Sequence, residues 1–261
     1  MTVDPRHQPE CAADAFRFPA RAVGSGDDHE RDTRWGGHSH SAHELIWNEC
    51  GVGHAVTGRQ LWTVTRTVGL WIPAGAPHSG SAPAGSRQMA VYFDASNPPL
   101  SDHPVAVDLT DLLRLLLDRL VTETLTSDAH RTTEQMIFDV LRPSDHGLVL
   151  QVPSSPLVAP VVDAVRRDPA DRRTLKDWAR ELGVSTRTIT RVFERETDLG
   201  FTRWLAAARA QVAVRLLGED MPIAKVADAV GYGSASSFTT AFRRVTGTTP
   251  GQFFAADLHA V

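Results

Sequence analysis

Two stretches near the C-terminus share one plan, and this plan restricts the fold more than any other feature of the chain. They run over residues 174–196 and 222–247. Each has a short helix with periodic apolar residues, a turn that contains a glycine (Gly183 or Gly231), and a second helix rich in Ser, Thr and Arg. One helix-turn-helix pattern also occurs in plain helical bundles. Two patterns at this spacing indicate a protein that reads DNA.

In the first stretch, apolar residues recur at steps of three and four, as expected of helices that pack on a small core. Ser185 is placed to cap the second helix of this stretch. The polar face of that helix then carries Arg187, Thr188, Thr190 and Arg191. Long donors of this kind are the side chains that contact bases and phosphates.

In the second stretch, the second helix presents a face of small residues, which suits a major groove only ~12 Å wide. This face consists of Ser234, Ala235, Ser236, Ser237, Thr239 and Thr240. Between the two stretches, residues 201–217 contain no Gly or Pro and many strong helix formers. A helix of this length spans ~25 Å. It is long enough to hold two recognition helices about one DNA turn apart.

Residues 157–257 resemble the DNA-binding domain of the AraC/XylS family of bacterial transcription regulators. The matching residues are Leu175, Ala179, Ser185, Phe193, Ile223, Ala227, Gly231, Tyr232, Phe238, Phe242, Arg243, Gly247 and Pro250. The resemblance implies base-reading positions at Arg187, Thr190, Arg191, Ala235, Ser236, Ser237 and Thr240. The predicted DNA-binding set is completed by Ser185, Thr188, Ser234 and Arg243. The family often has Arg in the place of Thr240, so we expect the second helix to supply shape fit and phosphate contact more than base discrimination.

Charge is divided unevenly between the two halves. The whole chain has a formal net charge of −4. Residues 157–261 contain 15 Lys and Arg against 12 Asp and Glu, whereas residues 1–156 contain 12 against 19. This asymmetry favours a basic DNA reader joined to an acidic regulatory half.

The N-terminal half is rich in short β-prone runs over residues 44–107, separated by Gly, Pro, Ser and Asn. Such punctuation predicts an antiparallel sandwich or barrel. The predicted fold class is therefore α+β, with a β-barrel, helices, and an all-α domain whose two helix-turn-helix units are joined by a long helix. The predicted segments are a flexible N-terminus (1–34), a barrel (35–107), a helical dimerisation region (108–142), a linker (143–156) and the DNA-binding domain (157–257).

One constellation of possible metal ligands stands inside the β-rich half. His38, His40 and Glu44 share parity, so on a continuous strand they face one way and His43 faces the other. His78 follows a Pro-Ala-Gly-Ala-Pro turn. Three imidazoles and one carboxylate form a good site for a divalent transition metal.

This constellation resembles the two metal motifs of the cupin barrel. The matching residues are His38, His40, Glu44 and Gly51 in the first motif and Pro73, Gly75 and His78 in the second. The resemblance implies one divalent metal ion, iron, zinc or manganese, held by His38, His40, Glu44 and His78. The open alternative is a metal-free effector pocket lined by the same residues and by Trp47, Trp62 and Trp71.

Residues 108–125 form a strongly amphipathic helix whose stripe includes Leu109, Leu113, Leu116 and Leu120. The spacing alone is equally compatible with a helix packed on the barrel and with a dimer contact. The resemblance implies a homodimer, because the family commonly pairs through helices at this place. We therefore predict dimerisation through these four leucines.

Several classes of protein are disfavoured by composition. Cys11 and Cys50 give no disulfide framework and suit a reducing cytosol. The first residues contain no apolar segment typical of a signal peptide. The most apolar stretch, residues 112–121, is too short to span a membrane and is interrupted by charges. These features predict a cytoplasmic protein without a membrane partner.

The sequence thus predicts a sequence-specific transcription regulator, not an enzyme, whose cupin-like half senses a small molecule or a divalent metal. The predicted partners are double-stranded promoter DNA, an unidentified small-molecule effector, a second copy of the chain and, for an activator, RNA polymerase. The alternative is a metal-dependent cupin oxygenase or isomerase with a helical appendage. The sequence offers no substrate base or nucleophile for such an enzyme.

Overall fold

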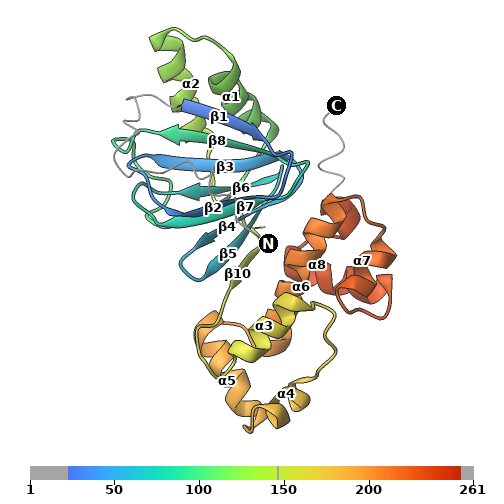
Figure 1. Ribbon diagram of the computed structural model, residues 1–261. Helices are drawn as coiled ribbons and strands as arrows, with labels where there is room; N and C mark the ends of the chain where they lie inside the picture. Colours follow the sequence, from blue (N-terminus) through green and yellow to red (C-terminus); the bar gives the residue numbers. More distant parts are fainter. Residues whose placement is uncertain (1–22, 146, 254–261) are drawn as a thin grey trace. The chain divides into compact units, whose positions relative to one another are not determined.

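The computed structural model describes residues 23–253 with the exception of residue 146. The chain divides into two compact units, and it enters the second unit twice. The described residues of the first unit are 23–58 and 64–147, and those of the second are 59–63 and 148–253. Strands with two helices form the first unit, and helices dominate the second (Figure 1).

Antiparallel sheets form most of the first unit. One sheet has the strand order β1–β8–β3–β6–β9, and in the other β4, β7 and β2 follow one another. The strands are β1 (Val23–Asp28), β2 (Thr33–His38), β3 (His43–Cys50), β4 (Gly53–Thr57), β6 (Val68–Ile72), β7 (His78–Ala82), β8 (Arg87–Phe93) and β9 (Val105–Asp108). The predicted α+β class is confirmed, with the difference that the strands form two sheets and not one closed barrel.

The N-terminal part of the first unit is more regular than expected. The prediction of a flexible segment over residues 1–34 is wrong for residues 23–34. There β1 pairs with β8, with Val23 opposite Tyr92, and β2 begins at Thr33. Backbone pairing fixes this segment although its side chains are mostly polar. The rest of the predicted segment, residues 1–22, lies outside the described residues.

Two helices follow the last strand of the first unit, α1 (Asp111–Thr122) and α2 (Ser127–Val140). Each begins after a threonine whose hydroxyl accepts a hydrogen bond from a backbone amide of the first turn. The apolar side of α1 faces the core of its own unit, where Leu113 and Leu117 are completely buried. Phe138 of α2 packs edge-on against Phe93 of β8, with ring centroids 5.1 Å apart.

The leucines predicted to form a dimer contact lie in this buried face. They are Leu109, Leu113, Leu116 and Leu120, each less than one tenth exposed within the single subunit. A side chain that its own subunit already buries adds no contact area with a partner, so the prediction is wrong for these four residues. Leu112 (50% exposed) and Leu115 (69%) lie on the outer side of α1. A dimer contact on this helix has to use that side.

The described part of the second unit contains six helices and a two-stranded ladder. The helices are α3 (Ala159–Arg167), α4 (Leu175–Glu181), α5 (Thr186–Thr197), α6 (Phe201–Gly218), α7 (Ile223–Ala229) and α8 (Ala235–Thr246). The ladder pairs β5 (Gln60–Val64) with β10 (Val149–Gln151) antiparallel, with Leu61 opposite Leu150. Neither α3 nor β10 was predicted from the sequence.

The tandem helix-turn-helix arrangement is confirmed. The helices α4 and α5 form the first unit of the pair, α7 and α8 form the second, and α6 joins them (Figure 1). Gly183 and Gly231, in the two turns, have φ values of 65° and 80°. Residues other than glycine rarely adopt this left-handed backbone conformation. Pro222 stands at the N-cap of α7.

One core cluster holds the first helix-turn-helix together. Trp178, Phe193 and Trp204 are almost completely buried in it, and the rings of Phe193 and Trp204 lie 4.9 Å apart. Leu150 of β10 belongs to the same cluster. The prediction of a linker over residues 143–156 is therefore wrong for β10, because this strand is part of the folded helical unit. The segment carries enough apolar residues, Leu148 and Leu150 among them, to be buried.

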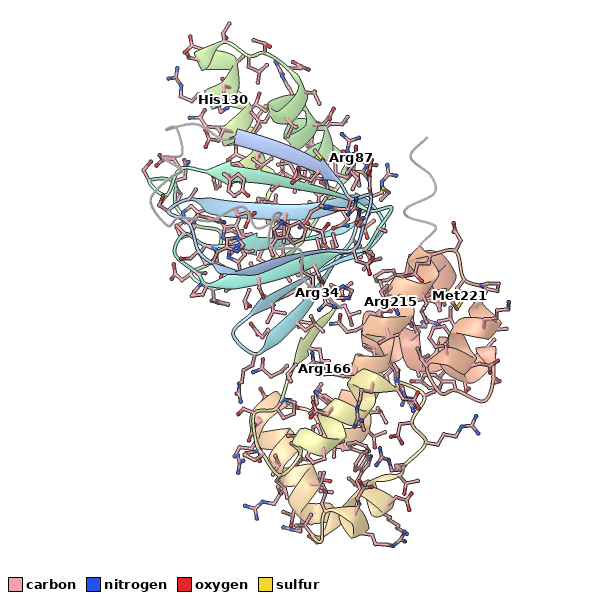
Figure 2. The ribbon with its side chains drawn as sticks, viewed as in Figure 1. Arg34, Arg87, His130, Arg166, Arg215 and Met221 are labelled. Carbon is pink, nitrogen blue, oxygen red and sulfur yellow. The ribbon has the colours of Figure 1, made fainter. Side chains whose placement is uncertain are left out.

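Arginines stand at the C-terminal ends of two helices of this unit. Arg166 lies in the last turn of α3 and Arg215 in the last turn of α6 (Figure 2). A positive charge there is favourable, because the helix dipole makes that end negative. Among the described residues, no helix combines the length and the apolar composition needed to cross a lipid bilayer.

Candidate metal centre and DNA interface

Three histidines of the first unit converge on one point. His38 ends β2, His40 lies in the connection to β3, and His78 begins β7. One ring nitrogen from each lies within 4.8 Å of the others. The rings of His38 and His78 are closest, with centroids 4.2 Å apart. Three imidazoles at this separation can share one metal ion.

The second nitrogen of each ring is held by the backbone. The Nδ1 atoms lie 2.9 Å from the carbonyl oxygen of Gly36 for His38, 3.0 Å from that of Ala42 for His40, and 2.9 Å from that of Ala76 for His78. A neutral ring that donates Nδ1–H to a carbonyl presents an unprotonated Nε2 to a metal ion. This second contact is the one that orients metal-binding histidines in proteins. A proton on Nε2, as in a hydrogen bond to a carboxylate, has to leave when the metal binds.

Glu44, on β3, completes the cluster. Its Oε2 atom lies 3.0 Å from Nε2 of His40 and 3.3 Å from Nε2 of His78. Burial alone raises the pKa of this carboxyl, but hydrogen bonds and charge from His40 and His78 outweigh burial and lower it to about 2. Burial lowers the pKa of His78, and the hydrogen bond with Glu44 reverses this and raises it. The cluster therefore holds a buried negative charge beside three nitrogen donors.

A turn fastens the connection that carries His40. The backbone amide of Gly75 donates a hydrogen bond of 2.8 Å to the carbonyl oxygen of His40. Gly75 has a φ of 78°, a conformation that glycine adopts without strain. On the other side, His78 is paired with His38 across β7 and β2. The Pro-Gly turn of the sequence thus places His78 and fixes the His40 loop.

The prediction that three of these residues share one strand is wrong. His38, His40 and Glu44 do not lie on one continuous strand, because residues 39–42 form a turn between β2 and β3. His43 faces elsewhere, as predicted. Its Nδ1 accepts a hydrogen bond of 3.0 Å from the amide of Ala74, and its ring stacks on Trp71.

Other candidate residues of the pocket have different roles. Trp47, Trp62 and Trp71 are 3%, 7% and 0% exposed, so all three pack in the cores of their units. Tyr92 of β8, which the sequence analysis missed, lies with its ring centroid 5.2 Å from that of His40. Only the strand register, with Tyr92 opposite Glu44, brings this tyrosine to the cluster.

The first recognition helix, α5, presents cations. Ser185 caps it, accepting a hydrogen bond of 3.1 Å from the amide of Thr188. Arg187, Thr188 and Arg191 are exposed along one side. No ion pair joins Arg187 or Arg191 to another described residue, whereas Arg195 is paired with Glu196 at 3.0 Å. Two long side chains that no described residue pairs with can reach bases or phosphates.

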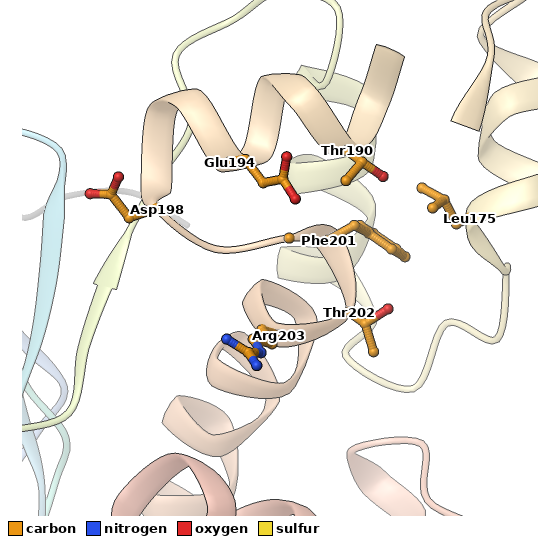
Figure 3. A pocket seen from close by; sticks show the side chains of 8 residues that line it. Leu175, Thr190, Glu194, Asp198, Phe201, Thr202 and Arg203 are labelled. Atoms are coloured by element: carbon orange, nitrogen blue, oxygen red, sulfur yellow. The ribbon is translucent and has the colours of Figure 1, made fainter. Parts of the chain in front are cut away.

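Thr190 differs from its neighbours on α5. It is half-buried and lines a cavity of about 310 Å³ between α4, α5 and the start of α6. Figure 3 shows it near Leu175 and Phe201, and Glu194 follows one turn later on the same helix. Thr190 is therefore less available to DNA than Arg187 and Arg191.

The second recognition helix, α8, presents short hydroxyl side chains. Ser234 caps it and accepts a hydrogen bond of 3.2 Å from the amide of Ser237. Ser236, Ser237 and Thr240 are exposed, and Ala235 is half-buried. The hydroxyls of Ser237 and Thr240 already donate to the carbonyl oxygens of Ser234 and Ser236. Arg243 and Arg244, both exposed in the last turn of the same helix, add positive charge to it.

Comparison with known proteins places this architecture. A family model described as a helix-turn-helix domain matches residues 178–256, from within α4 to beyond α8. The regulator NimR of Escherichia coli is 28% identical over 222 residues, which cover 84% of this chain and 81% of NimR. That alignment is longer than the second unit, so it includes part of the β-rich unit as well.

Two further relatives are similar over shorter parts of their own length. The regulator RipA of Corynebacterium glutamicum is 44% identical over 108 residues, 40% of this chain and 33% of RipA. An AraC-like transcription regulator of Streptomyces antibioticus is 28% identical over 186 residues, 70% of this chain and 54% of that protein. All three relatives carry names of transcription regulators.

Proposed function

We propose that this chain is a member of the AraC family of transcription regulators. We propose further that it binds promoter DNA through two recognition helices and responds to the occupancy of its histidine cluster. The relatives are regulators, which favours a regulator over a cupin oxygenase or isomerase. We therefore propose that the protein is not an enzyme.

The observation that best supports sequence-specific binding is the pair of arginines on α5 that have no ion-pair partner in the described part of the chain. Arg187 and Arg191 stand one helical turn apart on the exposed side of a helix that Ser185 caps. An arginine that binds O6 and N7 of guanine discriminates between bases. A gel-shift experiment with the DNA upstream of the protein's own gene and with a random duplex of equal length tests this. Equal affinity for both duplexes would contradict sequence-specific reading.

For the β-rich unit, we propose that His38, His40, His78 and Glu44 hold one divalent ion of iron, zinc or manganese. The main support is that backbone carbonyls bind all three Nδ1 atoms, while the Nε2 atoms of the three rings point toward one another. Such an ion would fix the three strand ends and accept further ligands at open positions. Since binding requires a neutral His78, and Glu44 raises the pKa of this histidine, occupancy should fall as the pH drops, beginning above the ordinary histidine range.

Elemental analysis of protein purified without chelator tests the metal proposal. We expect about one ion per chain in the wild type and none in His40→Ala. His103→Ala is the matched control, because His103 is exposed and lies outside the cluster. It is a better control than His43, whose ring is buried against Trp71. A wild type without metal, or full occupancy in His40→Ala, would leave the metal-free effector pocket as the explanation.

The remaining partners follow from this function. A regulator of promoter DNA works in the cytoplasm, commonly as a homodimer, and contacts RNA polymerase if it activates transcription. Light scattering of the full chain distinguishes a monomer from a dimer. A small-molecule effector would bind beside the histidine cluster, where Tyr92 adds an aromatic ring.

A further inference from the structure

A strand from the middle of the β-rich sequence is built into the DNA-binding unit. Residues 59–63 follow β4 in the chain, yet they belong to the compact unit of the helices. There they pair with β10. The amide of Thr63 donates to the carbonyl oxygen of Leu148 at 3.0 Å, and the amide of Val152 donates to that of Arg59 at 2.8 Å. We call the paired strands β5 and β10 the β5–β10 ladder.

One buried amide on α6 binds β5 and the residue that precedes β10. Gln211 is 3% exposed, although most buried neighbours on α6 are apolar. Its Nε2 donates to the carbonyl oxygen of Leu61 at 3.0 Å and to that of Leu148 at 3.2 Å. Its Oε1 accepts a hydrogen bond from the hydroxyl of Thr63. Both polar atoms of this side chain therefore join α6 to the ladder and to the residue that precedes β10.

Two further contacts tie the ladder to the first helix-turn-helix. The indole of Trp204, on α6, donates to the carbonyl oxygen of Gln151 at 2.9 Å. Glu196, on α5, accepts from the amides of Ser154 and Ser155 at 2.7 and 3.1 Å. The side chain of Arg59 lies 3.4 Å from the same carboxylate oxygen. These hydrogen bonds join the ladder and the residues that flank it to α5 and α6.

The same strand sequence leads back to the histidine cluster. Only two residues separate the end of β4 at Thr57 from the start of β5 at Gln60, and Gly58 takes a φ of 58° in that turn. Within the first unit β4 pairs with β7, with Val56 opposite Ser79. The next residue of β7 toward its start is His78, a ligand of the cluster. Hydrogen-bonded backbone therefore continues from His78 through β4 to the turn before β5.

We infer that Gln211 is a positioning residue that transmits the state of the histidine cluster to the DNA reader through the β5–β10 ladder. The inference rests on the proposed metal site. An ion that draws His38, His40 and His78 together fixes the start of β7, and β4 with it. Because β4 continues into β5, a shift of β4 is passed on to the carbonyl groups that Gln211 binds. The helix α6 carries both reading heads, so a shift at Gln211 changes how they meet successive grooves.

The test measures DNA affinity of the full chain with and without Zn²⁺ alone, using the upstream duplex. In the wild type we expect Zn²⁺ to change the affinity by about fivefold or more, the lower range of allosteric coupling. In Gln211→Leu we expect a change of less than about twofold, with Zn²⁺ still bound at the wild-type stoichiometry. Gln60→Leu makes the same chemical change on the ladder at a side chain that does not bind α6, and it should keep the wild-type response.

A pair of milder variants covers the case in which Gln211→Leu does not fold. Thr63→Val removes the hydroxyl that donates a hydrogen bond to Gln211 and keeps the shape of the side chain. It should therefore weaken the Zn²⁺ response. Thr63→Ser restores a hydroxyl and should restore the response. A role confined to stability would change the melting temperature of these variants and leave the ratio of the two affinities unchanged.

The outcomes separate this inference from the metal proposal. A folded Gln211→Leu protein that keeps the full Zn²⁺ response overturns the role of Gln211. A wild type that binds Zn²⁺ stoichiometrically without any change in DNA affinity overturns the coupling and leaves the metal site intact. A wild type that binds no metal refutes the site, and the inference falls with it.

Discussion

The two helix-turn-helix units share a backbone plan and differ in chemistry. In both, a glycine with positive φ ends the first helix, and a serine caps a recognition helix of 12 residues. The exposed face of α5 carries Arg187 and Arg191, whereas α8 carries Ser236, Ser237 and Thr240. A common plan therefore places two unlike surfaces where DNA would be read.

The difference indicates that the two helix-turn-helix units contribute unequally to DNA recognition. The arginines of α5 have no ion-pair partner among the described residues, so their donors are free for bases or phosphates. On α8, the hydroxyls of Ser237 and Thr240 already donate to carbonyl groups of their own helix. We infer that the first unit discriminates between sequences and that the second adds fit and phosphate contacts.

The supports of the two units differ as well. The first shares its core with α3 and with Leu150 of the β5–β10 ladder. The second is fastened by Arg209 of α6, which donates to the carbonyl oxygens of Pro169 and Asp171, both at 2.9 Å, and lies over the ring of Tyr232. A signal through the ladder therefore arrives at the unit that carries the arginines.

The largest effect should come from the two turn glycines, which look equivalent in the sequence. A Cβ at Gly231 would lie 2.8 Å from the guanidinium of Arg209 and 2.9 Å from the backbone of Ala170. A Cβ at Gly183 would meet nothing within 4 Å. Gly231→Ala should therefore lower the free energy of unfolding by about 2–5 kcal/mol, from positive φ and overpacking together. Gly183→Ala has only the backbone penalty, about 1–2 kcal/mol.

Urea unfolding of the full chain, followed at the transition of the helical unit, measures both values. Equal losses in the two variants would mean that the loop at Ala170 yields without cost. The second unit would then be less firmly held by Arg209 than the contacts indicate.

Much of this comparison could be predicted from the sequence. The periodic apolar residues, the turn glycines and the capping serines gave both helix-turn-helix units and α6, because these signals are local. The β10 strand could not be predicted, because its pairing partner lies almost 90 residues earlier in the chain. Gln211 left a weaker signal, a lone polar residue between Ala207 and Val214 on the buried face of α6.

The histidine cluster was predicted as a set of residues, but not as a geometry. The cupin-like motifs identified His38, His40, Glu44 and His78. Parity on one strand was the wrong reason, because a turn over residues 39–42 separates β2 from β3. Contacts that depend on strand register, such as that of Tyr92 with His40, have no local signature.

A smaller effect is expected on DNA affinity from single side chains of the two recognition helices. Arg191→Ala should weaken specific binding by about 1–3 kcal/mol if the arginine binds guanine. Ser236→Ala should cost less than about 1 kcal/mol, because a lone hydroxyl makes at most one neutral hydrogen bond. Fluorescence anisotropy with upstream and random duplexes separates the cases. A loss for Arg191→Ala that is equal on both duplexes would make it a phosphate contact.

The smallest effect is expected from the N-cap serines, which both helix-turn-helix units have. Ser185 and Ser234 each accept a hydrogen bond from a backbone amide of the first turn, at 3.1 and 3.2 Å. Ser185→Ala and Ser234→Ala should therefore each cost about 1 kcal/mol of stability, the usual value of an N-cap. DNA affinity should change little, because these hydroxyls already bind the helix.

Unequal losses of stability would show that the shared backbone plan does not imply shared energetics. A loss of specific binding at unchanged stability would instead make the cap a DNA contact. Thermal unfolding and anisotropy on the same two proteins decide between these results, and Gln60→Leu, a change outside both recognition helices, provides the baseline.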